Sequence, residues 1–338
     1  MKVAVGLSGG VDSAVTALLL RERGYEVVGY TMTLGRADEC VSLREAREAA
    51  DRLSLPLVVC DLAESWRSCV LDGLRASYLS GRTPNPCVTC NENVKMGLLP
   101  ARAFADGCDL FATGHYARTE VDSSGGVRLL RAVDRTKDQS YFLYRVSRDV
   151  LARTVFPLGG LMKSEVRARA RASGWPVADR GDSQDFCGGD PLAVIGASDR
   201  EGDIVDSSGK VLGRHKGFWR YTVGKRKGLG IGGGTPYYVL RLDAARNAVV
   251  VGFREEACTM AFPVTDVVWL RPAEDWAAAQ AAGELCVKVR SAGEPRGPVS
   301  FEDGLCRPGE AMSGVAPGQS AVFYHGDEVL GGGFIAAQ

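Results

Sequence analysis

Two segments of this 338-residue chain contain residue types and spacings that could do chemistry. The first is Ser8-Gly9-Gly10-Val11-Asp12-Ser13, here called the glycine loop, which lies between two apolar runs. Glycines let the backbone turn sharply, so the N–H groups of the loop and of a following helix can point at one anion. The pattern predicts a pyrophosphate site between a strand and a helix. An ordinary glycine turn with Asp12 or Ser13 as the helix cap is the structural alternative.

The second segment carries thiols. In residues 83–91, two prolines are expected to stiffen a loop that presents Cys87 and Cys90, and Cys187 follows in the polar stretch 183–187. A Cys-x-x-Cys spacing suits a metal, a disulfide couple or a nucleophile with its helper. Structural zinc and incidental buried cysteines remain alternatives, although none of the three histidines has the spacing that would complete a zinc site.

The overall composition is that of an ordinary globular enzyme. Lys and Arg number 41 and Asp and Glu also number 41, and 45% of the residues are hydrophobic. Nucleic-acid binding would therefore need a local basic patch, which residues 214–227 could supply. Neither a leader-like start nor an apolar run of membrane-spanning length is evident. We expect a cytoplasmic protein in which the ten cysteines stay reduced.

The first third of the chain alternates between strand and helix patterns. Strands are expected at residues 2–7, 26–32, 56–61 and 110–114, with helices at about 13–23, 41–53 and, further on, 163–173. Such alternation predicts an α/β domain with a parallel sheet covered by helices on both faces. Ligands of such sheets bind at the carboxyl ends of the strands, so the glycine loop, Met32 and Gly114 with His115 should converge there.

The pattern changes at about residue 195. Beyond it the chain is rich in glycine, with short strands expected at 236–242, 248–252, 286–290 and 320–324 and a lone helix at 272–280. These features predict a small central β-rich domain and a C-terminal β-barrel-like domain. The expected boundaries are 1–195, 196–260 and 261–338, in line with two or three domains for this length.

Six motifs together carry a family resemblance. The glycine loop lacks the endings of the Walker and dinucleotide motifs and resembles the PP-loop of ATP pyrophosphatases. The other five occur in the order found in bacterial tRNA-specific 2-thiouridylases, at residues 83–91, 112–117, 137–143, 183–187 and 221–230. The chain resembles that family nearly end to end, which implies a first domain of the adenine nucleotide alpha hydrolase type.

The resemblance implies ATP-dependent 2-thiolation of the wobble uridine of tRNA, with lysine, glutamate and glutamine isoacceptors as expected substrates. Sulfur would arrive as a persulfide from a cysteine desulfurase or a sulfur-relay protein. Because the C2 oxygen of uracil is a poor leaving group, it would first be adenylated, with Mg²⁺ held by Asp12 at the phosphates. The implied ATP site comprises Gly6, Leu7, Ser8, Gly9, Gly10, Val11, Asp12, Ser13, Met32 and Gly114.

The resemblance also assigns the sulfur chemistry and the RNA contacts. Cys90 would be the nucleophile, Cys187 would carry the persulfide, and a disulfide would join them after transfer. The substrate base would leave the anticodon stack. The tRNA and its target base would contact Asn85, Pro86, Cys87, His115, Lys137, Asp138, Gln139, Arg290, Ser291 and Gln319. Purely structural roles are the alternatives for Met32 and His115.

The chain departs from the family at Cys87, where most members carry aspartate. Cys87, Cys90 and Cys187 form a three-thiolate set that resembles other tRNA-thiolating PP-loop enzymes, which hold a [4Fe-4S] cluster with one iron open to sulfide. A cluster mechanism is therefore an alternative to the persulfide mechanism. The stretch Gly188-Gly189-Asp190 also lacks the apolar residue usual in the family after the third cysteine.

Two other functions fit parts of the pattern. One is a PP-loop enzyme that adenylates a small molecule, although amide formation of that kind needs no thiols and no added β-domains. The other is a non-catalytic RNA-binding module with metal at the cysteines, against which the intact glycine loop argues. Turnover of ATP to AMP stimulated by tRNA would separate all three functions.

Overall fold

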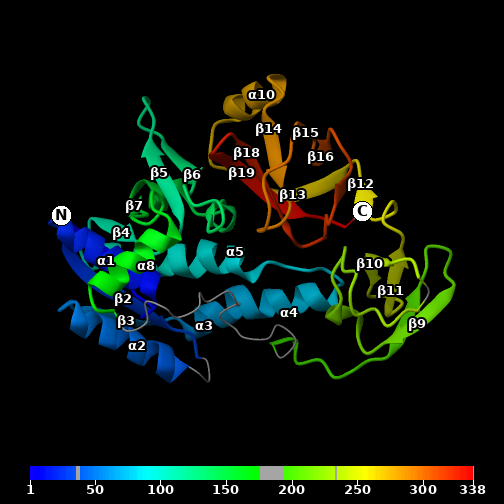
Figure 1. The fold of residues 1–338 in the computed structure, drawn as a ribbon, viewed down its shortest axis with the longest axis horizontal. Helices are drawn as coiled ribbons and strands as arrows, with labels where there is room; N and C mark the ends of the chain where they lie inside the picture. The colour runs from blue at the N-terminus through cyan, green and yellow to red at the C-terminus, as the bar shows by residue number, and fades with distance from the viewer. Residues whose placement is uncertain (36–38, 176–193, 233, 338) are drawn as a thin grey trace. The chain divides into compact units, whose positions relative to one another are not determined.

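The computed structural model describes residues 1–35, 39–175, 194–232 and 234–337, which form two compact units. The first unit contains residues 1–70 and 87–175, apart from the gap at 36–38, together with Asp327–Val329. The second contains Leu71–Pro86, the described part of residues 186–326, and residues 330–337. Figure 1 labels many of the elements of each unit.

The first unit is built on a five-stranded parallel sheet in the order β3-β2-β1-β4-β7. Its strands are β1 (Lys2–Gly6), β2 (Glu26–Thr33), β3 (Leu57–Asp61), β4 (Leu110–Ala112) and β7 (Thr154–Val155). The middle of β1 is fully buried and reads as a continuous apolar run, because a parallel sheet is covered on both faces. The prediction of a parallel α/β domain is confirmed.

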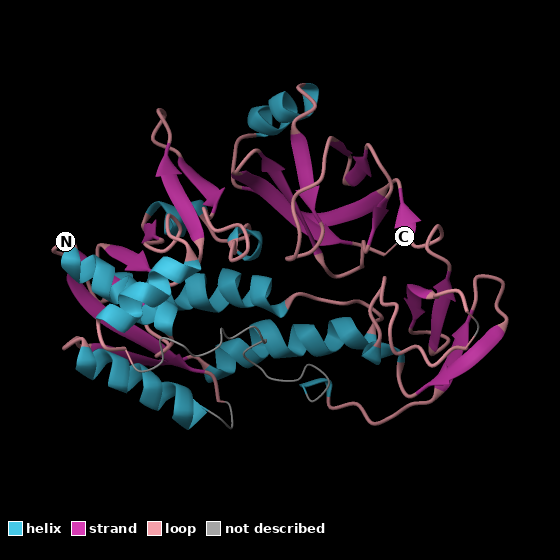
Figure 2. Ribbon diagram, viewed as in Figure 1, coloured by secondary structure: helices cyan, strands magenta, loops and turns pink. Residues whose placement is uncertain are grey.

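The helices of the first unit pack through small and branched side chains. The main ones are α1 (Val11–Glu22), α2 (Glu39–Arg52) and α8 (Lys163–Ala172), with shorter helices α3 (Ala63–Trp66), α7 (Arg148–Ala152) and a 3-10 turn, η3 (Ser140–Phe142). α1 and α8 share a core through residues such as Val15 and Val166. α2 packs its alanines at positions 49 and 50 against Leu7, just after β1. Figure 2 distinguishes these helices from the strands of the sheet.

A β-hairpin was not predicted. Strands β5 (Ala117–Val121) and β6 (Val127–Arg131) pair in antiparallel register, and Glu328 and Val329 pair with the second of them. The turn depends on Asp122, whose carboxylate accepts hydrogen bonds from the backbone of Ser124 and Gly126. Only the first residue of β5 is buried, so the strand offers little of the apolar pattern that predicts a strand.

The Cys-x-x-Cys segment is helical. Pro86–Cys90 forms α5, which continues as a π-helical stretch, η2 (Asn91–Leu98), and as α6 (Leu99–Ala105). Proline is tolerated at the first helical position, where its missing N–H would have no partner. The prediction of a stiff loop was therefore wrong, and Cys87 and Cys90 instead lie on the first turns of a long helical segment.

The second unit begins with a four-stranded sheet in the order β10-β11-β8-β9. These strands are β8 (Gly202–Val205), β9 (Val211–His215), β10 (Tyr238–Asp243) and β11 (Ala248–Gly252), with a 3-10 turn, η4 (Phe218–Arg220), beside them. Their core contains Ile204, Phe218 and Val249, and Tyr78 of α4 (Asp72–Leu79) packs against it. Leu71–Pro86 thus belongs with the later half of the chain.

The remaining strands of the second unit surround another apolar core that includes Trp276 and Phe323. The elements are β12 (Cys258–Thr259), β13 (Phe262–Trp269), α10 (Ala273–Ala281), β14 (Leu285–Lys288), β15 (Val299–Glu302), β16 (Leu305–Pro308), β17 (Met312–Ser313), β18 (Ser320–His325) and β19 (Glu328–Ile335). The predicted β-rich second half is confirmed. None of the described helices has both the length and the hydrophobicity needed to cross a bilayer.

Candidate active site

The glycine loop turns directly from β1 into α1. Gly9 has φ +81°, and a Cβ added there would lie 2.5 Å from the backbone carbonyl carbon of Glu45 in α2, so only glycine fits. The Ser8 N–H donates to Ser13 Oγ at 3.2 Å, and Ser13 Oγ donates to the Gly10 carbonyl at 3.0 Å. The loop is therefore held by its own polar groups and by the adjacent helix.

The first turn of α1 offers free donors to an anion. Gly10 is the N-cap residue and makes no side-chain cap. Within the described residues, no protein group accepts a hydrogen bond from the backbone amides of Val11, Asp12 and Ser13. Unpaired amides at the positive end of a helix attract negative charge. The geometry supports the predicted phosphate site.

An ion pair stands beside this anion site. Lys163 Nζ donates to both carboxylate oxygens of Asp12, at 2.7 and 2.8 Å, and Tyr116 Oη donates to Oδ1 at 2.9 Å. The Lys163 side chain is only 10% exposed, whereas that of Asp12 is 32% exposed. The pair joins α1 to α8 across 151 positions of sequence. It balances a carboxylate that would otherwise repel a phosphate.

The start of α8 is positioned by Asp134. One carboxylate oxygen of Asp134 accepts the backbone N–H of Lys163 at 3.0 Å, and the other accepts both donors of Thr136. Burial acts to raise the pKa of Asp134, but these hydrogen bonds outweigh it and lower the pKa below 3.8. The ionised Asp134 carboxylate therefore holds the backbone of Lys163 at the start of α8.

The carboxyl ends of three strands meet at this site, as predicted. Gly6 ends β1, Met32 lies near the end of β2, and Gly114 follows β4. A Cβ on Gly114 would lie 3.0 Å from Asp12 and from the Ser13 nitrogen, so the chain after β4 approaches the glycine loop closely. Met32 is half-buried and pairs with Cys60 of β3. Its predicted contact with adenosine stays a prediction.

Cys90 is buried, at 3% exposure, and Cys87 is half-buried. The helical segment that carries them is anchored through Asn91, whose side chain donates to the Phe142 carbonyl at 3.2 Å, and through a 2.8 Å ion pair of Glu92 with Arg145. Cys187, with residues 183–190, lies outside the described residues. The predicted pairing of thiols is therefore untested.

The motif at residues 137–143 stabilises the site through hydrogen bonds of its side chains. The Asp138 carboxylate is buried and accepts the backbone N–H of Ala132 and both donors of Ser140. Gln139 Oε1 accepts the Tyr116 backbone N–H at 2.9 Å. Asp138 and Gln139 thus position other site residues. Their predicted contacts with tRNA, and that of half-buried Lys137, stay predictions.

His115 is held in its neutral form. Its Nδ1 and the Thr113 hydroxyl are 2.8 Å apart, and its ring packs edge-on against Phe156. Burial lowers the pKa of His115 below its ordinary value of 6.5, and the positive charge of Lys95 lowers it further. A neutral imidazole can exchange hydrogen bonds with RNA but adds no charge.

The other predicted tRNA contacts belong to the second unit. Gln319 Nε2 donates to the Thr83 carbonyl at 2.8 Å, which ties the chain before half-buried Asn85 and Pro86 to the turn before β18. Arg290 donates to the carbonyls of Val223 and Gly314, at 3.0 and 2.9 Å. Arg290 and neighbouring Ser291 are exposed, and their RNA contacts stay predictions.

Sequence reasoning missed Lys163 and assigned no role to Tyr116. One signal for Lys163 was available, because lysine at the first position of a helix places a cation at the positive end of the helix dipole. Such a disfavoured choice indicates that another interaction holds the side chain. No local pattern, however, names a partner as distant as Asp12.

Three family models match consecutive parts of the chain. They are the tRNA methyl transferase HUP domain over residues 1–188, the tRNA methyl transferase PRC-barrel domain over 193–253, and the aminomethyltransferase beta-barrel domain over 259–335. Together with the parallel sheet and the glycine loop, these matches define a PP-loop protein with two β-barrel-type domains after its HUP domain.

Curated relatives identify the family within this class. The chain is 43% identical to the tRNA-specific 2-thiouridylase MnmA of Geotalea uraniireducens, over 99% of this chain and 94% of the relative. The MnmA of Geobacter metallireducens is 42% identical, over 99% and 97%. The chain belongs to the MnmA family of tRNA-specific 2-thiouridylases. A 4-thiouridine synthetase solved with RNA and ATP aligns at 18% identity over 55% of this chain and 44% of that one, with a TM-score of 0.35.

The glycine loop provides a direct test of the anion site. Gly9→Ala should weaken binding of ATP or pyrophosphate at least about tenfold, because both the positive φ and the contact with Glu45 oppose a side chain. Gly24→Ala is a matched control, since Gly24 has φ +82° but nothing within 4 Å of an added Cβ. Calorimetric titration measures both variants. Equal affinities for ATP in the two variants would contradict the assignment.

The half-buried His115, whose pKa is lowered, predicts a dependence of stability on pH. Its folded pKa lies below the unfolded one, so the unfolded chain binds the extra proton and stability falls as the pH drops below about 6.5. His115→Gln should remove up to about 1.4 kcal/mol of that loss per pH unit. Urea unfolding between pH 7 and pH 5 measures it. His215, whose pKa burial also lowers, remains in both proteins. Identical pH profiles would disprove the prediction.

Proposed function

We propose that the chain is a tRNA sulfurtransferase that uses ATP to convert the wobble uridine to 2-thiouridine. The observation that carries the proposal is the intact glycine loop with its open α1 amides. The chain that contains it is 43% identical, over nearly its full length, to a relative named tRNA-specific 2-thiouridylase MnmA. The matches to three consecutive family models, a HUP domain followed by two β-barrel domains, support it as well.

In the first step the uracil C2 oxygen attacks the α-phosphorus of ATP. The bond from that phosphorus to its bridging oxygen breaks, and pyrophosphate leaves into the glycine loop, where the amides of α1 would hold it. The C2 position then carries AMP, a far better leaving group than oxide. Gly6, Leu7, Met32 and Gly114 would border the nucleotide.

The residues of this chain also bear on the charge of the phosphates. Both carboxylate oxygens of Asp12 accept hydrogen bonds from Lys163. A Mg²⁺ ion bound by Asp12 would therefore either share the carboxylate with the Lys163 ammonium group or displace that group. Mg²⁺ would neutralise the departing pyrophosphate. Assignment of the ion to Asp12 remains a proposal, and Lys163 supplies a cation at the same place.

In the second step sulfur replaces the activated oxygen. The terminal sulfur of a Cys187 persulfide would bond to C2, and AMP would leave with the former C2 oxygen. The Cys90 thiolate would then attack the Cys187 sulfur, releasing thiouridine and leaving a disulfide. An external dithiol would reduce that disulfide, and a cysteine desulfurase or relay protein would regenerate the persulfide on Cys187. Both partners are part of the proposal.

The three-thiolate set keeps a cluster mechanism as a second candidate for the same reaction. Cys87 stands within one helical turn of Cys90, where it could ligate iron beside it. Among the described residues, no three His, Cys, Asp or Glu side chains are gathered as metal ligands, and Cys187 lies outside them. Anaerobic purification decides: full activity in an iron-free protein excludes the cluster.

The wobble nucleosides of cells that lack this protein test the proposed function. Mass spectrometry should show loss of 2-thiouridine from the lysine, glutamate and glutamine tRNAs, and a copy of the gene on a plasmid should restore it. Persistence of 2-thiouridine in the deletion strain would overturn the proposal.

The thiol assignment predicts the behaviour of single variants. Cys90→Ser and Cys187→Ser should each abolish thiolation while ATP affinity is unchanged, because the thiols act only after adenylation. Cys258→Ser, at a half-buried cysteine in β12, is the control and should retain activity. Thiouridine is quantified by its retardation in mercury-containing gels. Full thiolation by either test variant excludes that residue from the pair.

Lys163 gives a second prediction for the nucleotide site. Lys163→Met should lower the affinity for ATP by about tenfold or more, because it leaves the Asp12 carboxylate facing the phosphates without its partner. Lys163→Arg should restore part of the affinity, and exposed Lys210→Met should change nothing. Unaltered ATP affinity in Lys163→Met would show that the ion pair is only structural.

A further inference from the structure

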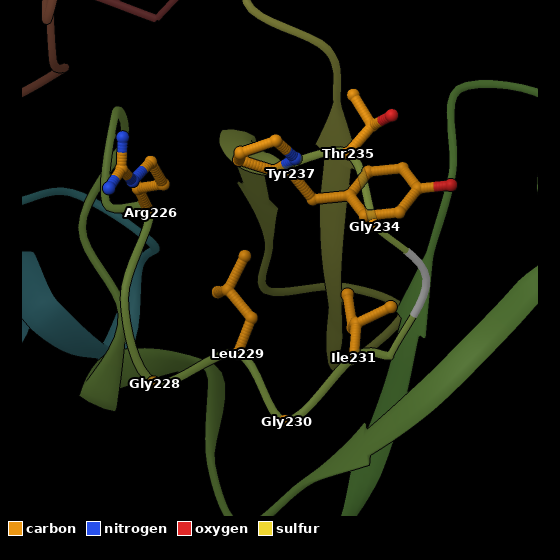
Figure 3. Close-up of a pocket in the computed structure, with 9 residues that line it drawn as sticks. Arg226, Gly228, Leu229, Gly230, Ile231, Gly234, Thr235 and Tyr237 are labelled. Atoms are coloured by element: carbon orange, nitrogen blue, oxygen red, sulfur yellow. The ribbon is translucent and has the colours of Figure 1, made fainter.

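A polar pocket of about 250 Å³ lies in the four-stranded part of the second unit. Figure 3 shows Arg226 on one side and Thr235 and Tyr237 on the other, with Gly228 and Gly230 along the turn between them. We call this the central pocket. It lies within the sixth motif and the segment after it, to which neither the proposed chemistry nor the predicted site residues assign a role.

In the loop that lines the central pocket, apolar residues that pack in the core alternate with exposed glycines. Leu229 is 6% exposed and packs in the core of the four-stranded sheet, and Ile231 packs against the same core. The glycines at 228, 230 and 232 are exposed. Apolar anchors therefore hold the loop in place while its glycines leave the backbone accessible to a ligand.

The accessible backbone presents hydrogen-bond donors. Within the described residues 226–232 and 234–237, no backbone N–H donates to another described protein group. Gly228 and Gly230 have φ of +75° and +67°, although nothing lies within 4 Å of a Cβ added to either. The glycines are therefore required by conformation and not by crowding. Backbone amides that have no acceptor in the described protein can donate to an anion in the pocket.

The charge at the mouth of the pocket is not compensated. Residues 214–227 include cations that are already engaged: Arg214 pairs with Glu201 and Asp203, and Arg220 pairs with Asp199. Arg226 and Lys227 are exposed, and each makes no ion pair with any described residue. These two cations remain available to a negatively charged partner.

The aromatic ring of Tyr237 forms one wall of the pocket. The Tyr237 ring stacks on Phe253, with centroids 5.0 Å apart and planes at 22°. Phe253 is 42% exposed, and Tyr237 lines the pocket with its ring held by this stack. Aromatic faces beside cations are the usual surface for unpaired bases and sugars of RNA.

We propose that the central pocket binds a backbone phosphate of the tRNA, with the adjoining sugar or base against Tyr237. The open amides and Arg226 would contact the phosphate oxygens, and Lys227 would face a neighbouring phosphate. This inference rests on the proposed function, because it takes tRNA as the substrate. It selects Arg226 and Lys227 from the basic patch predicted at residues 214–227, and it adds the open amides and Tyr237, which were not predicted to contact tRNA.

Paired substitutions test the charge. Arg226→Ala combined with Lys227→Ala should weaken tRNA binding about tenfold near 0.1 M salt. The slope of log affinity against log salt should shrink by about two, one for each lost phosphate contact. Lys210→Ala, at an exposed lysine with no assigned role, is the control for loss of one surface charge. Unchanged tRNA affinity and slope in the double variant would overturn the proposal.

Glycine substitutions test the backbone independently of charge. Gly230→Ala requires a non-glycine residue at φ +67°, whereas Gly232→Ala meets open space without a positive φ. The first should weaken tRNA binding and the second should leave it intact. Equal binding by both variants would show that the loop conformation does not serve the RNA. Circular dichroism confirms that each variant is folded.

Two further measurements distinguish tRNA from other ligands of the central pocket. Binding of free AMP or ATP that is lost in the Arg226, Lys227 double variant would assign the pocket to a nucleotide and overturn the RNA proposal. Reduced capture of the sulfur-donor protein with unaltered tRNA affinity would assign it to a protein. If the wild-type chain binds tRNA through this pocket but makes no 2-thiouridine, the proposed function fails while this inference stands.

Discussion

The ion pair of Lys163 with Asp12 is the interaction on which the rest of the site depends. It joins α8 to the first turn of α1, and Tyr116 donates to the same carboxylate from the segment after β4. Three stretches of chain therefore meet at one group. Removing either charge would leave the other poorly compensated in a largely buried place, which is costly. The glycine loop can hold phosphates because the negative charge nearest to it is already balanced.

The same contact network extends to the thiol. The Tyr116 backbone N–H donates to the Gln139 side chain, and the same motif contains Phe142, whose carbonyl accepts a hydrogen bond from Asn91. Asn91 follows Cys90 directly in the helical segment. A short series of hydrogen bonds thus links the nucleotide side of the first unit to the proposed nucleophile. Each member is a side chain or amide within one unit, so the two reacting regions are positioned by one framework.

Local patterns predicted much of this architecture and missed its long-range contacts. The strand, glycine turn and helix at residues 2–22 follow from neighbouring residues, and the parallel sheet follows from the alternation. The helix at Pro86–Cys90 was missed because two prolines in residues 83–91 indicated a loop, although proline is compatible with a first helical turn. Lys163 and Asp134 could not be assigned, because their partners are fixed only when α8 packs.

The measurement that bears most directly on the central claim follows the oxygen of the substrate. A tRNA made with ¹⁸O at C2 of the wobble uridine is incubated with the enzyme, ATP, Mg²⁺ and a sulfur donor. The account predicts 2-thiouridine together with pyrophosphate and AMP that carries one ¹⁸O atom, since the C2 oxygen leaves on the phosphorus it attacked. Release of unlabelled AMP, or of ADP and phosphate, would contradict adenylation at C2.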